Sequence, residues 1–132
     1  MKSLLNDWQH FMRENKDSKI VAKAVIYIGD EMLLLLHERG WDLPGGHIKQ
    51  EEDIIDGLIR EVEEETGLQV TADKIKGPVY RAGHMSVYEI RLQLGAVRLS
   101  DEHHDYKLIH PDDIGTFKMS DPFKRAIQKT FE

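Results

Sequence analysis

The chain contains no cysteine, which excludes disulfide bonds, a thiolate nucleophile, zinc–thiolate sites and iron–sulfur clusters. Long hydrophobic runs are also missing, and the longest purely apolar run, residues 32–36, is far too short to cross a bilayer. Residues 1–15 mix charged and polar side chains with apolar ones, so they lack the continuous apolar core of a signal peptide. The simplest interpretation is a soluble cytoplasmic protein that does not associate with membranes.

Basic residues are in the minority, with 18 Lys and Arg against 24 Asp and Glu, which gives a formal charge of −6. Nucleic-acid binding depends on basic side chains that displace counterions from phosphates, so this balance argues against a nucleic-acid partner. Many of the acids are concentrated in one segment: Glu51, Glu52, Asp53, Asp56, Glu61, Glu63, Glu64 and Glu65. A phosphate group bound near this segment would need cations to mediate the contact.

No repeat, low-complexity stretch or linker divides the chain, and 132 residues suit a single domain. Hydrophobic periodicity and turn residues predict interleaved helices and strands, and therefore a mixed α/β fold in which helices cover a sheet. We expect helices at residues 4–12, 53–66 and 122–131, strands at 20–28, 32–36, 79–81, 85–94 and 106–109, and an irregular loop at 42–46. Gly67 and Leu68 are expected to cap the second helix.

The helix expected at residues 53–66 carries three different faces at 100° per residue. The apolar face consists of Ile55, Leu58, Ile59 and Val62, the outer face of Asp56, Arg60 and Glu63, and the third face of Glu61, Glu64 and Glu65. Like charges at i+3 and i+4 destabilise a helix by roughly 0.2–0.5 kcal/mol per pair. Arg60 is one position away and reaches Glu52 or Glu64, but it cannot neutralise three acids.

A bound hard cation would relieve this repulsion, because Mg²⁺ and Mn²⁺ prefer carboxylate oxygens and retain water and phosphate as further ligands. The alternative is an ordinary solvated acidic helix, which is what most glutamate-rich helices are. The helix pattern alone leaves both interpretations open.

From Gly46 to Leu68 the chain reads GHIKQEEDIIDGLIREVEEETGL, which resembles the Nudix box G-x5-E-x7-R-E-U-x-E-E-x-G-U, where U is a bulky aliphatic residue. The fixed positions are filled by Gly46, Glu52, Arg60, Glu61, Val62, Glu64, Glu65, Gly67 and Leu68. The preceding segment WDLPGG is similar to the usual lead-in of the family. On this basis the chain is identified as a small, MutT-type member of the Nudix hydrolase family.

The resemblance implies an α/β/α sandwich, a mixed sheet flanked by helices, spanning residues 1–132 as one domain with a helical extension at 1–15 and the box at 46–68. It also implies that Glu61, Glu64 and Glu65 hold Mg²⁺, with Mn²⁺ as a substitute. Glu52 and Arg60 match a structural pair that ties the loop to the helix. Gly45 and Gly46 would let backbone approach the metals or phosphates, although a plain turn would require them too.

In the family one carboxylate accepts the proton of the attacking water, and here Glu61, Glu64 and Glu102 are the candidates. Glu102 precedes Tyr106 as a similar acid does in related members, and it is also a candidate metal ligand; an ordinary loop position is the alternative. Arg39 is a candidate phosphate contact, against a surface salt bridge as the alternative.

The resemblance implies hydrolysis of a phosphoanhydride bond in a nucleoside diphosphate linked to another group. Signatures of several subfamilies are absent outside the box, which favours a nucleoside or deoxynucleoside triphosphate as the substrate. An RNA 5′-pyrophosphohydrolase, a dinucleotide or nucleotide-sugar hydrolase and a non-catalytic nucleotide sensor stay open as alternatives. Residues 1–15 are expected to pack on the sheet, while a lid and a homodimer contact are the other roles considered.

Overall fold

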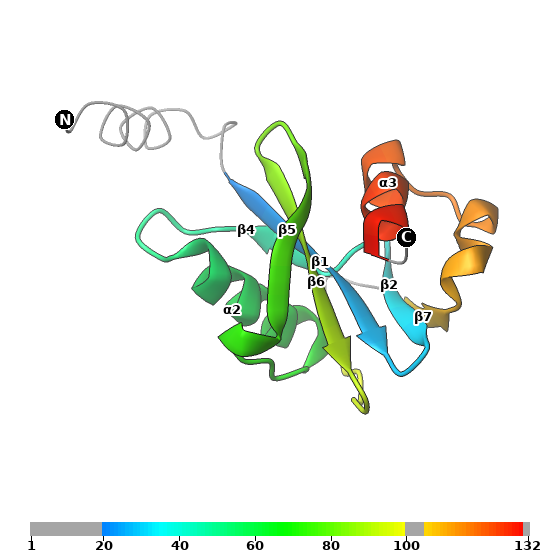
Figure 1. The fold of residues 1–132 in the computed structure, drawn as a ribbon, viewed down its shortest axis with the longest axis horizontal. Coiled ribbons are helices and arrows are strands. Elements are labelled where there is room, and N and C mark those ends of the chain that lie inside the picture. The colour runs from blue at the N-terminus through cyan, green and yellow to red at the C-terminus, as the bar shows by residue number, and fades with distance from the viewer. Residues whose placement is uncertain (1–19, 100–104, 131–132) are drawn as a thin grey trace.

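A mixed β-sheet forms the centre of the fold in a computed structural model, which describes residues 20–99 and 105–130 (Figure 1). Its strands are β1 (Val21–Ile28), β2 (Glu31–His37), β3 (Gly40–Asp42), β4 (Gly45–His47), β5 (Ile75–Ala82), β6 (Met85–Leu92) and β7 (Asp105–Ile109). They follow the order β3-β2-β1-β6-β5, with β4 paired to β1 and β7 to β2. Only the pairing of β1 with β6 is parallel among those described. The expected mixed sheet is confirmed.

Two helices cover opposite faces of this sheet and create two hydrophobic layers (Figure 1). Helix α2 (Ile54–Thr66) buries Leu58 and Val62 against alternate β1 residues such as Ala24 and Ile26. Helix α3 (Asp121–Thr130) packs with the other face of the same strand. Apart from Lys23, strand β1 is apolar along both faces because both are covered. Within the described ranges, no helix is long and apolar enough to cross a membrane.

The prediction of an irregular loop at residues 42–46 was wrong, because two short strands, β3 and β4, occupy most of this segment. Strand β4 pairs antiparallel with the start of β1, in a register that sets Gly45 opposite Lys23 and Gly46 opposite Ala22. Gly45 has a φ of 128°, and a Cβ there would collide with the backbone of β1. The two glycines therefore permit a close strand pairing, whereas they had been interpreted as a break in regular structure.

The end of α2 follows the predicted cap. Gly67 adopts a left-handed conformation with a φ of 74°, and its N–H donates to the carbonyl of Glu63 at 2.9 Å. Leu68 is buried in the layer beneath α2. This cap fixes the last turn of the helix, which carries Glu64 and Glu65.

Other element boundaries differ from the expectation. Strand β5 begins at Ile75 and not at residue 79, because the chain continues to pair through Gly77 and Pro78 with an irregular register. Proline is tolerated there since β5 lies at the edge of the sheet. Strand β6 ends at Leu92, before the exposed Leu94. Two 3₁₀ helices, η2 (Ala72–Lys74) and η3 (Pro111–Thr116), were not predicted. The opening helix expected at residues 4–12 lies outside the described residues.

Candidate active site

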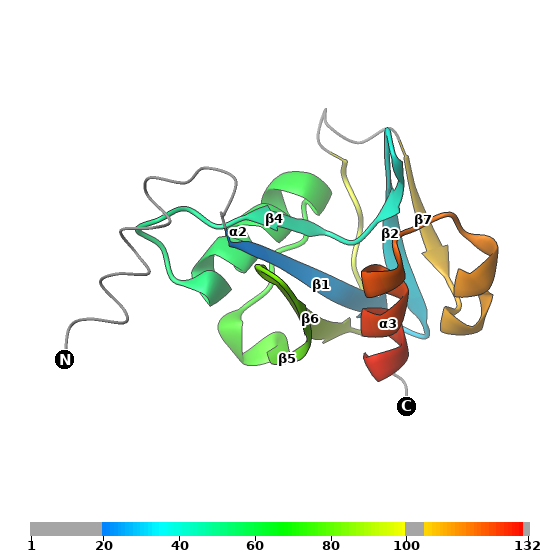
Figure 2. The ribbon, with the colours of Figure 1, turned by 90° about the horizontal axis from the view of Figure 1, so that it is seen from above.

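The glycine strand β4 and the last turns of α2 bring together residues that are separated in sequence (Figure 2). The N–H of Gly45 donates a hydrogen bond to Glu65 Oε1 at 2.6 Å. A Cβ added to Gly46 would lie 2.7 Å from Glu61 Oε2. Two of the three predicted metal-binding carboxylates therefore lie directly against the glycine backbone.

Glu65 is buried, with 7% of its surface exposed. Burial raises the pKa of its carboxyl group to about 7, because removal from water disfavours the ionised form. The hydrogen bond from Gly45 and the charge of Lys23 lower this pKa, while the nearby Glu61 and Asp42 raise it. Glu65 is thus an acid whose charge is costly unless a cation compensates for it.

Arg60 contacts three carboxylates at once. Its guanidinium binds Glu52 through Nη2 at 2.6 Å and through Nε at 3.1 Å. Its Nη1 lies 3.2 Å from oxygens of both Glu61 and Glu64. The arginine holds the pKa of Glu52 down at about 2, and the bond to Glu52 raises the arginine's own pKa. The expected reach of Arg60 to Glu52 or Glu64 is confirmed, but its side chain is only 24% exposed and also contacts Glu61, so it does not lie on a solvent-facing outer face.

The contacts of Glu61, Glu64 and Glu65 show how well these three carboxylates suit a divalent cation. Glu61 and Glu64 already converge on one cationic nitrogen, and carboxylate oxygens are the donors that Mg²⁺ prefers. In residues 20–99 and 105–130, however, no group of three or more His, Asp or Glu side chains stands in a metal-binding arrangement. Glu65 is directed at Gly45 and the other two acids at Arg60. The donor chemistry fits a divalent ion, and Arg60 occupies the place of a cation between two of the acids.

Sequence reasoning missed Lys23, which lies near the start of β1 with only 12% of its side chain exposed. Its Nζ donates to Asp42 Oδ2, to the carbonyl of Leu43 and to the carbonyl of Gly45, each at 3.2 Å. The same ammonium lies 5.8 Å from the centre of the Phe123 ring on α3. A signal was present, because Lys23 is the one charged residue within the apolar run at residues 21–28.

The remaining predicted residues are not brought into this cluster. Arg39 is exposed in the turn between β2 and β3, and its expected phosphate contact stays a prediction. Glu102 lies outside the described residues. Trp41, in the segment before the box, packs edge-on against Phe117 at 5.5 Å between ring centres, with Lys107 Nζ 5.8 Å from its ring.

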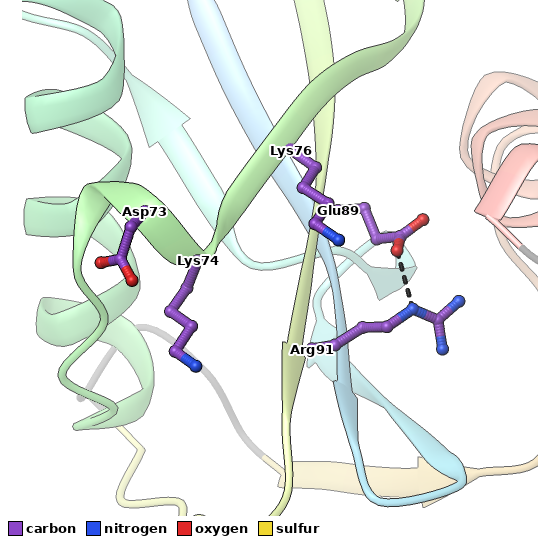
Figure 3. A pocket seen from close by; sticks show the side chains of 5 residues that line it. All are labelled: Asp73, Lys74, Lys76, Glu89 and Arg91. Carbon is purple, nitrogen blue, oxygen red and sulfur yellow. Dashed lines mark hydrogen bonds and ion pairs between the residues drawn. The ribbon is translucent and has the colours of Figure 1, made fainter.

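A polar hollow lies elsewhere, where η2 meets β5 and β6 (Figure 3). It is lined by Asp73, Lys74, Lys76, Glu89 and Arg91 and shares no residue with the glycine–glutamate cluster. Arg91 is held there by Glu89 at 2.7 Å and by the carbonyl of Thr130 at 2.8 Å. These contacts fasten the last turn of α3 to the sheet.

Comparison with known proteins places the chain in one family. The family model of the NUDIX domain matches residues 18–131. A MutT-like protein of Streptomyces ambofaciens is 35% identical over 102 residues, which cover 71% of this chain and 66% of that protein. A Nudix hydrolase of Bacillus subtilis is 37% identical over 59 residues, but the match spans only 37% of that relative and 43% of this chain.

Among solved structures, the MutT protein of Methanosarcina mazei superposes with a TM-score of 0.67 and 25% identity. The superposition covers 84% of this chain and 91% of that protein. An Ap4A hydrolase of C. elegans shares the fold with a TM-score of 0.64 at 23% identity, covering 85% and 94% of the two chains. Together with the glycine strand packed on the acidic end of α2, these matches establish that the chain belongs to the NUDIX family.

Proposed function

We propose that this chain hydrolyses a phosphoanhydride bond in a nucleoside diphosphate linked to another group, using Mg²⁺ bound by Glu61, Glu64 and Glu65, with Mn²⁺ as a substitute. The observation that carries the proposal is the packing of Gly45 and Gly46 directly against two of these acids. Such a site offers oxygen ligands on one side and a backbone without side chains on the other. The missing Cβ atoms let strand β1 and the Glu61 carboxylate approach the glycine backbone closely, which brings the oxygen ligands and the backbone of β4 into one site.

The divalent ion, when bound, neutralises phosphate oxygens and lowers the pKa of the attacking water. Glu61 and Glu64 would leave Arg60 to serve as ligands, while Glu52 keeps the guanidinium attached to the loop before α2 through its two hydrogen bonds. One carboxylate then accepts the proton of the water, and Glu61, Glu64 and Glu102 are the candidates. Glu52 and Arg60 support the site and take no part in the chemistry.

For the substrate we propose a nucleoside or deoxynucleoside triphosphate. The support is the similarity to the MutT-like protein of Streptomyces ambofaciens and to the MutT protein of Methanosarcina mazei. An RNA 5′-pyrophosphohydrolase is disfavoured by the net charge of −6, because an RNA chain requires a basic surface. A dinucleotide or nucleotide-sugar substrate is a further candidate. A homodimeric assembly stays a prediction. A nucleotide sensor would bind substrate without cleaving it.

The decisive experiment is a screen for phosphate and pyrophosphate release from nucleotides with Mg²⁺ or Mn²⁺, run on wild type, Glu64→Gln and Glu63→Gln. Glu63 is the exposed neighbour of Glu64 and contacts Gln69, so its substitution is a matched control. We expect a turnover loss of about 100-fold or more for Glu64→Gln and less than about threefold for Glu63→Gln. Unchanged turnover in Glu64→Gln would refute the ligand role, and nucleotide binding without turnover in wild type would identify a sensor.

A further inference from the structure

Lys23 has all of its hydrogen-bonding capacity committed inside the protein. An ammonium group has three protons to donate, and Lys23 gives one each to Asp42, Leu43 and Gly45. Its nitrogen therefore has no proton left for a substrate phosphate. Whatever Lys23 contributes to the reaction must pass through the groups to which it is bonded.

Those groups belong to β4, the strand that touches the acids, or to the residues just before it. Lys23 and Gly45 are direct partners in the pairing of β1 with β4, so the side chain of Lys23 bonds the carbonyl of the residue opposite its own backbone. The N–H of Gly45 then donates to Glu65 Oε1 at 2.6 Å. One residue further on, the backbone of Gly46 lies against the carboxylate of Glu61. The chain of contacts runs from the ammonium through two consecutive glycines to two carboxylates.

Glycine strands of this kind hold their position poorly by themselves, since they have no side chains to pack and the largest backbone freedom. Strand β4 has three residues, Gly45–His47, and the pairing with β1 is its one described strand partner. Lys23 binds this strand and the residues just before it at three separate acceptors. A charge-assisted bond to Asp42 is stronger than a neutral one, so the segment 42–45 is clamped to β1.

We propose that Lys23 is a positioning residue that clamps the segment 42–45 onto β1 and thereby fixes the ligand geometry of Glu61 and Glu65. This role rests on the proposed metal-dependent hydrolysis and deepens it. A residue outside the ligand set that orients the ligands typically changes metal affinity or activity about 10- to 100-fold when it is removed. The same magnitude is expected here, with little effect on substrate binding, because Lys23 already donates its three protons within the protein.

The test compares wild type, Lys23→Met, Lys23→Arg and Lys76→Met in the full chain. Methionine matches the length of lysine without the charge, arginine keeps the charge, and Lys76 lies in the remote hollow on β5. Three quantities are measured: Mn²⁺ affinity by electron paramagnetic resonance, amide exchange of Gly45 by NMR, and kcat and KM on the best nucleotide. Because Lys23→Met leaves Asp42 without its partner, the double variant Lys23→Met, Asp42→Asn is included to keep the charge balanced if the single variant fails to fold.

We expect Lys23→Met, or the double variant, to weaken Mn²⁺ binding and to lower kcat by about 10- to 100-fold, with KM within about threefold of wild type. Gly45 should exchange faster, Lys23→Arg should recover most of the loss, and Lys76→Met should match wild type. Wild-type Mn²⁺ affinity and kcat in a folded variant without Lys23 would overturn the positioning role and leave the hydrolase proposal intact. A wild-type chain that takes up no Mn²⁺ and cleaves no nucleotide would overturn the hydrolase proposal first, and the positioning role with it.

Discussion

Replacing Glu65 by glutamine should stabilise the metal-free protein, and the gain should depend on pH. Burial raises the pKa of Glu65 from 4.5 to about 7, which makes its ionised form costlier in the folded chain by an amount on the order of 3 kcal/mol. Glutamine keeps the shape of the side chain and the carbonyl oxygen that accepts the N–H of Gly45. It has no charge to bury.

The direction of the pH effect follows from the two pKa values. Between pH 4.5 and about 7 the folded state keeps the proton of Glu65 while the unfolded chain releases it, so the wild type loses stability as the pH rises. Below pH 4.5 both states are protonated and the variant has little advantage. Above pH 7 both states are ionised, and the full difference is present. The variant should therefore exceed wild type by up to about 3 kcal/mol at pH 8 and by much less at pH 4.5.

Urea unfolding followed by circular dichroism, in EDTA at several pH values from 4.5 to 8, measures this difference directly. Glu63→Gln, which removes an exposed acid two positions earlier, is the control and should show the same pH dependence as wild type. With Mg²⁺ present at pH 8, wild type should regain stability while Glu65→Gln should not, because ligands stabilise only the state that binds them. If Glu65→Gln is less stable than wild type at pH 8, or differs from it by the same free energy of unfolding at every pH, the buried charge of Glu65 does not destabilise the folded protein.

Two further predictions concern the groups around the acids. Gly46→Ala would place a Cβ 2.7 Å from Glu61 Oε2 and should reduce turnover at least about tenfold, whereas Gly115→Ala, in open space on η3, should leave it unchanged; equal activity of the two variants would show that the close approach is unimportant. Glu52→Gln should lower the free energy of unfolding at pH 7 by about 1–2 kcal/mol, because a charge-assisted pair with Arg60 is lost. The pKa of Glu52 is lowered to about 2, so this stabilisation is present above pH 4.5 and disappears as the pH falls toward 2. Urea titrations across that range measure it, and a constant difference at all pH values would contradict it.

The helix and its acidic face could be predicted because both depend on local periodicity. A spacing of 100° per residue sufficed to separate Leu58 and Val62 from the three acids, and Gly67 marked where the helix ends. The family pattern added the identity of the fold, which the superposed structures confirm. Both signals lie within a short stretch of chain.

Contacts between distant segments could not be predicted in the same way. Lys23 meets its partners 19 to 22 residues further along the chain, and only the pairing register of β1 with β4 brings them together. That register was hidden because Gly45 and Gly46 were interpreted as part of an irregular loop. The reach of Arg60 to Glu52 and Glu64 was predicted from their spacing, but its contact with Glu61 was missed, since helical position fixes where a side chain starts and not where a long side chain ends.

Joint binding of a divalent cation by the acids at the end of α2, beside the glycine strand, is the basis of the proposed hydrolysis. Its most direct test is an Mn²⁺ titration of wild type, Glu63→Gln and the double variant Glu61→Gln, Glu64→Gln, with free Mn²⁺ counted by electron paramagnetic resonance. We expect uptake by wild type and Glu63→Gln, and an affinity at least about tenfold weaker in the double variant. No uptake by wild type, with or without nucleotide, or equal uptake by the double variant, would contradict it.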